Sequence, residues 1–146
     1  MKRFTFDLEK VLELRAHRER EAELALGKAV GALSRIERQI QTIAEQRVSA
    51  AAERFAPGNT TALIKQYDCY MLRLDTAKNA LLEDAAKAAL QVEEARKVYT
   101  GASRERKVIE KVKENREREY RKQFLAEEGK ALDDLAGGAG VRRSIG

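Results

Sequence analysis

A chain of 146 residues with 36% charged and only 5% aromatic residues is long enough for one domain but lacks the large apolar residues of a thick core. With no tryptophan, one proline and few β-branched runs, the sequence excludes a β-sheet and predicts an all-α protein with thin helix-on-helix packing. The net charge of +5 is compatible with phosphates, acidic protein surfaces or anionic lipid headgroups as partners.

The compartment can be predicted from simple features of the chain. The single cysteine, Cys69, has no partner for an internal disulfide, which suits a reducing compartment. The run Met1–Asp7 is followed at once by charged residues, so the apolar core of a signal peptide is missing. No window approaches the roughly 18 apolar residues that span a bilayer. We therefore expect a cytoplasmic protein.

A first helix is expected over about 7–54. Asp7 can cap the free N–H groups at its start, and Phe6 can pack onto Val11. Gly27 and Gly31, one turn apart, have two interpretations: they allow a close helix approach, or an exposed face tolerates them. Apolar residues recur at steps of three and four, the seam of a coiled coil, at Ala22, Leu26, Ala29, Leu33, Ile36, Ile40 and Ile43.

The only proline, Pro57, lies in a turn expected over 55–60. Proline inside a helix costs roughly 3 kcal/mol, because it removes a backbone donor and collides with the preceding turn. Since Pro57 is followed by Gly58 and no other proline occurs, the sequence predicts one break between two very long helices.

A second helix is expected over about 61–128, capped by Asn59, Thr60 or Thr61. It continues the spacing of three and four through Tyr67, Tyr70, Leu74, Ala77, Leu81, Ala85, Ala88, Val92, Ala95, Tyr99, Ala102 and Ile109. Gly101 is a weak point within it, and Gly129 is the first stop signal after it. The glycine-rich stretch 131–146 is expected to be a flexible C-terminal tail.

These elements predict an all-α fold in which two long helices form an antiparallel coiled-coil hairpin, a single domain over 1–130. If the chain folds back symmetrically at its proline, residue n faces roughly residue 115 − n, and Phe6 lies near Ile109. The stretch Glu110–Phe124 then projects beyond the first helix without an internal partner.

The positive charge is concentrated in Arg96–Lys122, where 11 Lys/Arg minus 5 Asp/Glu gives +6, whereas the remainder, 18 minus 19, gives −1. Repeated basic residues are compatible with nucleic-acid binding. However, five glutamates are interleaved among them, and the few aromatic residues form no stacking platform. A membrane surface would need a broad apolar face that this stretch lacks. We therefore expect neither nucleic acid nor direct membrane contact.

The chemistry of catalysis is missing from the sequence. The sole histidine, His17, lies among arginines without neighbouring metal ligands, and adjacent pairs such as Glu93 and Glu94 do not share a helix face. The run Gly137–Gly140 lacks the preceding strand and following helix of a nucleotide-binding loop. We predict a protein that is not an enzyme and uses no metal or cofactor.

Both ends of the chain resemble the small coiled-coil protein of the bacterial flagellar type III export apparatus, the FliJ family. At the N-terminus the resemblance lies in FTFDLEKVLELR, over Phe4–Arg15, and in Glu19–Ala29. At the C-terminus it lies in ERKVIEKVKE, over Glu105–Glu114, and continues to Asp134. Length, two-helix layout and the central break agree across nearly the whole chain.

The resemblance implies a cytoplasmic stalk similar in shape to the central shaft of F-type ATPases. Family members insert into the ring of the export ATPase hexamer and promote its assembly. They also engage the cytoplasmic linker of the export gate and handle the export chaperones, so membrane contact runs only through the export apparatus. The predicted function is thus a non-enzymatic stalk of flagellar or related type III export.

Two sets of partner-binding residues follow. The family contacts the gate through an aromatic residue and a leucine one turn apart early in the second helix, which Tyr70 and Leu74 match; ordinary seam packing is the alternative. For the ATPase ring we predict the paired termini, with a solvated basic helix as the alternative. This ring set consists of Phe4, Phe6, Arg106, Lys107, Lys111, Lys113 and Arg116.

Other hypotheses remain open at the level of the sequence. A structural coiled-coil scaffold that homodimerises through the second helix, without an ATPase partner, would show the same heptads. A basic coiled coil that binds nucleic acid is the third hypothesis.

Overall fold

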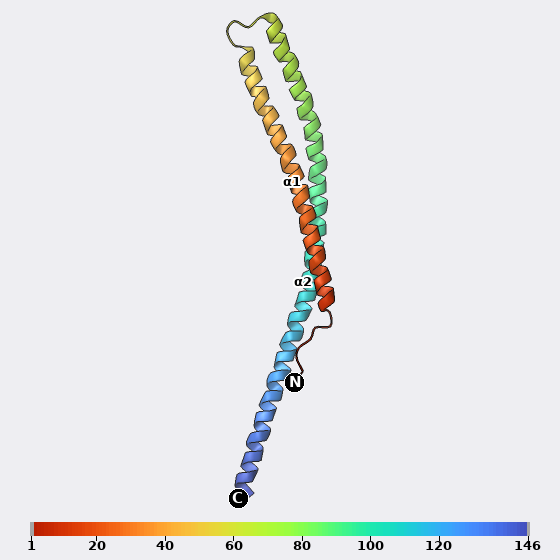
Figure 1. Cartoon of the computed structure of the whole chain (residues 1–146), viewed down its shortest axis with the longest axis vertical. Helices are drawn as coiled ribbons and strands as arrows, with labels where there is room; N and C mark the ends of the chain where they lie inside the picture. The colour runs from red at the N-terminus through yellow and green to blue at the C-terminus, as the bar shows by residue number, and fades with distance from the viewer. Residues whose placement is uncertain (1, 146) are drawn as a thin grey trace. The chain divides into compact units, whose positions relative to one another are not determined.

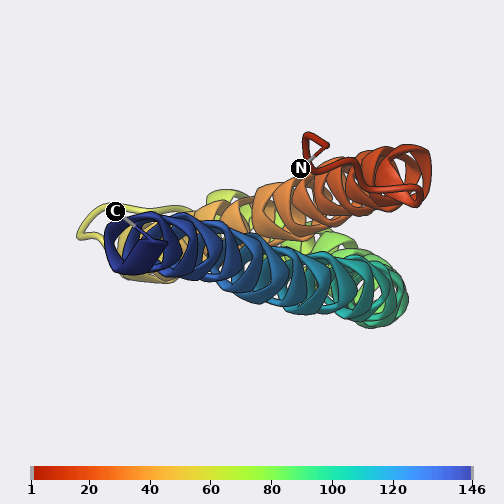
Figure 2. The same ribbon diagram turned by 90° about the horizontal axis from the view of Figure 1, so that it is seen from below.

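The computed structural model describes residues 2–145, with the side chains of 141 and 143–145 left out (Figure 1). Within this range the chain forms two helices, α1 over Glu9–Arg54 and α2 over Thr61–Ile145, and no strand. The chain before Glu9 is irregular, which the view from below also shows (Figure 2). The prediction of an all-α fold with two long helices is confirmed.

The turn over 55–60 is built by side-chain caps on both helices. The Asn59 amide donates hydrogen bonds to the carbonyl oxygens of Glu53, at 2.8 Å, and Arg54, at 3.1 Å, at the end of α1. The Glu53 carbonyl also accepts a hydrogen bond from the amide of Ala56 at 3.1 Å. Thr60 accepts a hydrogen bond from the amide of Leu63 at 3.3 Å and is the N-cap of α2. Of the three candidate caps, Thr60 starts α2, and Asn59 instead ends α1.

α2 continues past its expected end near residue 128. Its backbone is helical through Gly129 and the glycines from Gly137 to Gly140, because each helical glycine costs only about 1 kcal/mol and no proline interrupts the chain. Described side chains beyond Lys130 are exposed. The flexibility of the tail 131–146 stays a prediction, and Gly146 lies outside the described residues.

Contacts divide the chain into two compact units. The hairpin unit is Arg20–Gly101, and the terminal unit joins the chain up to Glu19 with the chain from Ala102 onward. In each unit a part of α1 runs antiparallel to a part of α2. The expectation of one continuous domain over 1–130 stays a prediction.

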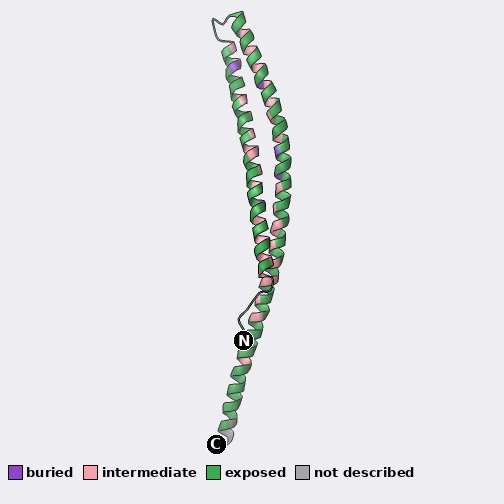
Figure 3. Ribbon diagram, turned by 45° about the vertical axis from the view of Figure 1, so that its right-hand side comes forward, coloured by how far each residue is buried: buried purple, intermediate pink, exposed green. Residues whose placement is uncertain are grey.

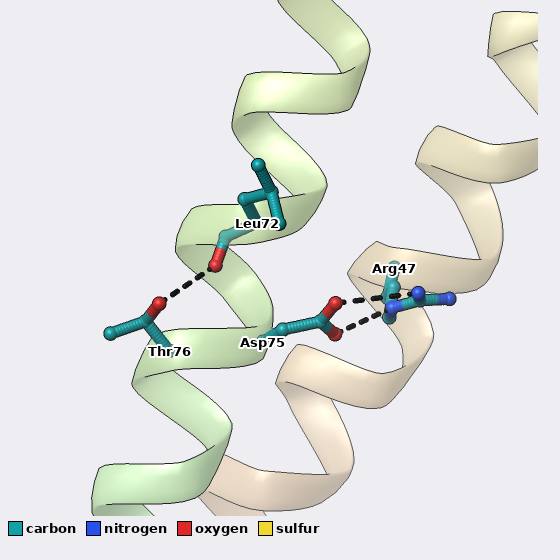
Figure 4. A network of polar contacts seen from close by, with 4 residues as sticks. All are labelled: Arg47, Leu72, Asp75 and Thr76. Carbon is teal, nitrogen blue, oxygen red and sulfur yellow. Dashed lines mark hydrogen bonds and ion pairs between the residues drawn. The ribbon is translucent and has the colours of Figure 1, made fainter.

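The hairpin unit is held by a thin seam (Figure 3). Its buried residues are mostly small or medium in size: Ala22, Ala50, Leu74, Ala88 and Val92. Polar contacts flank the seam. Arg47 Nε donates to Asp75 Oδ1 at 2.6 Å, and on α2 the Thr76 hydroxyl donates to the Leu72 carbonyl at 2.9 Å (Figure 4). Arg54, the last residue of α1, pairs with Asp68 at 2.7 Å.

These pairs correct the expected register. Arg47 pairs with Asp75 in the hairpin unit, and Glu9 pairs with Lys113 in the terminal unit, so the residue numbers of each pair add up to 122 instead of 115. The symmetric estimate failed because the turn is asymmetric. Asn59 donates hydrogen bonds directly to the last carbonyls of α1. Because Arg54 pairs with Asp68, the first turns of α2 lie beyond the end of α1. Each residue of α1 therefore faces a residue about two turns further along α2.

The glycines of the helices are tolerated and are not needed for close packing. A Cβ atom built on Gly27 or Gly31 would meet nothing within 4 Å, which excludes the close-approach interpretation. Gly58 differs, because its φ of +85° lies in the left-handed region that glycine enters without strain.

Two substitutions test this distinction. Gly31→Ala should raise the free energy of unfolding by about 1 kcal/mol, because alanine is the better helix former and has open space. Gly58→Ala should lower it by about 1 kcal/mol, because alanine is strained at positive φ. Urea unfolding followed by circular dichroism at 222 nm measures both, and a loss of stability in Gly31→Ala would contradict the assignment of that glycine to an open face.

Candidate partner-binding surfaces

The chain before α1 packs against α2 in the terminal unit. We call residues 2–8 the N-terminal segment. The hydroxyl of Tyr120 donates a hydrogen bond to the carbonyl of Lys2 at 2.6 Å. The ring of Phe4 lies 5.4 Å from that of Tyr120, and Tyr120 in turn stacks on Phe124 at 6.4 Å. This aromatic cluster ties an irregular segment to a helix without regular backbone pairing.

Phe6 anchors the N-terminal segment. It is 9% exposed, and Lys113 Nζ and the guanidinium carbon of Arg116 lie 5.9 Å and 5.5 Å from its ring centre, within cation–π range. The same two cations pair with acids that follow Phe6 in the sequence: Arg116 binds Asp7, and Lys113 binds Glu9 at 2.9 Å. The aromatic and acidic residues of this part of the chain therefore match a basic, partly apolar face of α2.

Ion pairs also hold the terminal unit together near residue 19. Arg106 of α2 binds Glu19 of α1 and also Glu110 on its own helix, at 2.5 Å. The hydrogen bond to Glu19, and then the one to Glu110, raise the pKa of Arg106, and the hydrogen bond to Glu9 raises the pKa of Lys113. Both cations therefore stay charged, and their charge is neutralised within the protein.

The structure separates the predicted ring-binding residues into two groups. Phe4, Phe6, Lys113 and Arg116 come together at the N-terminal segment, and Arg106 joins the helix pairing nearby. Lys107 and Lys111 are different, because they are exposed and pair with no described residue of α1 or of the N-terminal segment. Lys111 reaches Glu114 only at 3.8 Å, and Lys107 forms no ion pair among the described residues. The stretch Glu110–Phe124, expected to lack an internal partner, has one: Lys113 pairs with Glu9, Arg116 with Asp7, and Tyr120 contacts Lys2 and Phe4.

Three further exposed cations share the face of Lys107 and Lys111, and sequence reasoning did not single them out. We call the whole set the basic stripe, and it consists of Arg104, Lys107, Lys111, Arg118 and Lys122. Their steps of three, four and seven residues follow one face of a helix. The spacing was visible in the sequence, but a list of Lys and Arg does not reveal which face points towards α1.

The predicted gate-binding pair is split between core and surface. Leu74 is 7% exposed and lies in the seam of the hairpin unit, whereas Tyr70 is 38% exposed. Tyr70 borders a shallow hollow that it shares with Leu63, Gln66 and Tyr67. The Tyr67 hydroxyl donates to Glu53 at 3.1 Å, and this bond raises the pKa of Tyr67.

The described residues contain no group of His, Cys, Asp or Glu arranged to hold a metal ion. Cys69 is exposed. Within residues 2–145, neither helix has a stretch with the length and apolarity of a membrane span.

Comparison with known proteins gives one finding. The family model described as "Flagellar FliJ protein" matches residues 4–144, nearly the whole chain. No curated protein and no solved structure matches.

Phe6 provides a test of the N-terminal segment. Phe6→Ala should destabilise the terminal unit by about 3 kcal/mol and free residues 2–8, because the buried ring and both cation contacts are lost. Hydrogen exchange measured by mass spectrometry should show faster exchange in that segment. Phe55→Ala is the matched control, because Phe55 is 76% exposed and its removal should change little. Equal protection of residues 2–8 in wild type and Phe6→Ala would show that Phe6 is not the anchor.

Proposed function

Because the chain belongs to the flagellar FliJ protein family, we propose that it acts as a non-enzymatic stalk of the flagellar type III export apparatus. Membership of the family makes it a component of flagellar protein export. In the proposed role it inserts into the export ATPase ring and promotes ring assembly and activity. It also couples the ring to the export gate and the export chaperones.

The terminal unit is the observation that carries the proposal of ring binding. There the N-terminal segment packs against the part of α2 from Lys113 to Tyr120. The N-terminal segment is held by Phe6, Asp7 and Glu9, which leaves Lys107 and Lys111 exposed on α2. The face of α2 that contacts α1 and the N-terminal segment is neutralised by ion pairs within the protein, whereas the face with Lys107 and Lys111 is basic and exposed. A narrow unit of this kind suits insertion into a ring whose lining carries acidic groups.

Ring binding can be tested with the cognate export ATPase. The protein should raise the steady-state ATP hydrolysis rate and shift the ATPase towards the hexamer in analytical ultracentrifugation. Lys107→Glu/Lys111→Glu should lower the stimulation on the order of tenfold, because both cations are exposed and their reversal leaves the N-terminal segment intact.

The control for this experiment is Lys65→Glu/Lys87→Glu, which changes the net charge equally on exposed positions of the hairpin unit. The ring-binding proposal would be wrong if wild-type protein at saturation left an active ATPase unstimulated. Replacing Arg116 is less informative, because it also breaks the pair with Asp7.

Gate binding is proposed for Tyr70, with Leu74 as its support from the seam. An exposed tyrosine beside a shallow hollow can anchor a partner, because it offers a large rigid surface and a polar tip. Leu74 is too buried to be the principal contact. Its proposed contribution is to hold α2 in place beneath Tyr70. The chaperone role rests on the family resemblance.

Tyr70→Ala should weaken binding to the cytoplasmic linker of the export gate by about tenfold while the helical signal stays unchanged. Titration calorimetry with the purified linker measures the affinity. Leu72→Ala is the control, since Leu72 is 66% exposed and two residues away on another face of the helix. Equal affinities of wild type and Tyr70→Ala would exclude Tyr70 from the contact.

A second candidate is a homodimerising scaffold, which one observation favours. The C-terminal part of α2 exposes Leu125, Leu132 and Leu135, at steps of seven and three. This spacing is that of a coiled-coil seam without a partner among the described residues. Sedimentation equilibrium distinguishes the stalk from the homodimerising scaffold, because the scaffold would be a dimer at micromolar concentration.

A further inference from the structure

We propose that the basic stripe of α2 is a docking surface for an acidic helix of a partner protein, whose carboxylates recur at steps of three and four. The proposal deepens the ring-binding function by naming the chemistry of the surface that meets α2. It rests on that function in taking the partner protein to be the ATPase ring.

The structure sorts the cations of α2 between Arg104 and Lys122 into two classes, apart from the exposed Arg121. Those that face α1 and the N-terminal segment are neutralised: Arg106 by Glu19, Lys113 by Glu9 and Arg116 by Asp7. Those of the basic stripe are exposed, and apart from the long contact of Lys111 with Glu114 they form no ion pair with any described residue. The uncompensated charge of this part of α2 is therefore concentrated on the face directed away from the rest of the protein.

The stripe has the dimensions of a helix-binding surface. From Arg104 to Lys122 it extends over about 27 Å at 1.5 Å per residue. Its steps of three, four and seven residues keep the charges on one face of α2. A helix that lies along this face and carries Glu or Asp at the same steps would oppose each cation with one carboxylate.

Two neighbouring features favour a protein over nucleic acid. Val108 is exposed beside Arg104 and Lys111, and an aliphatic side chain in this position can contact an apolar residue of a helix but not a row of phosphates. Glu114 and Glu119 are exposed on the two sides of the stripe. Their charges would repel a broad polyanion such as duplex nucleic acid, whereas a single helix fits between them.

The inference can be tested on the full chain with a synthetic acidic peptide as the probe. The peptide is a helix of about 20 residues with glutamate at heptad a and d positions, labelled for fluorescence anisotropy. A second peptide has the same composition but glutamates spread around the helix. We expect the patterned peptide to bind on the order of tenfold more tightly.

Variants separate the stripe from net charge. Arg104→Glu/Arg118→Glu/Lys122→Glu should weaken binding of the patterned peptide on the order of tenfold or more. The matched control, Lys65→Glu/Arg73→Glu/Lys87→Glu, makes the same change in net charge on exposed positions of the hairpin unit and should weaken it much less. Equal losses in the two triple variants, or equal binding of the two peptides, would overturn the proposal.

Two further probes address the other occupants. A duplex DNA of about 20 base pairs and vesicles containing phosphatidylserine should each bind more weakly than the patterned peptide at physiological salt. Tighter binding of either, lost in the stripe variant, would overturn the assignment to a protein partner.

The same variants also test whether the ATPase ring uses the stripe. Their results for the stripe can be told apart from the results for the stalk function. If wild type stimulates the ATPase, the stripe variant should require about tenfold more protein for the same stimulation. Unchanged stimulation by the stripe variant would show that the ring does not use the stripe and would overturn this inference while the stalk function stands. If wild type does not stimulate, the stalk proposal fails, and the peptide measurements alone decide the inference.

Discussion

The offset between the two helices is the constraint on which the rest of the structure depends. It is set at the turn, where Asn59 binds the carbonyls of Glu53 and Arg54 and α2 begins its first turns beyond the end of α1. A shift of seven residues is about two helical turns. The same faces of α1 and α2 therefore still meet, but each residue of α1 meets a different residue of α2. Glu9 consequently faces Lys113, and the N-terminal segment reaches Tyr120.

This offset also decides which charges are neutralised. With a symmetric turn, Lys113 and Arg116 would project beyond the first helix as exposed cations. With the observed offset they pair with Glu9 and Asp7 around the ring of Phe6. Because these pairs are exposed, each contributes little to stability, and its main effect is to specify the register. The cations on the opposite face have no such partner, and they remain to bind another molecule.

The packing is thin throughout, which has consequences for function. The buried side chains are few and small apart from Phe6 and Leu74, so no single region holds most of the stability. Units of this kind open locally at low cost when one anchor is removed. The N-terminal segment is anchored by Phe6 and a few ion pairs, and the exposed Tyr70 lies one helical turn before the buried Leu74. Partner binding and local stability are therefore closely connected at both proposed surfaces.

The sequence by itself determined the two helices, because one proline in 146 residues leaves one place to break and the apolar steps of three and four are those of a coiled-coil seam. It also predicted ring-binding residues at the paired ends, including Phe6, Lys107 and Arg116. Only the tertiary structure decided the register, since the pattern repeats every seven residues and shifts by whole repeats look alike in the sequence. The asymmetric turn selects one of these shifts. For that reason Arg116, which a symmetric turn would leave beyond the first helix, pairs with Asp7. Lys107 is exposed because it lies on another face of α2, and in the hairpin unit Leu74 is buried while Tyr70 is exposed.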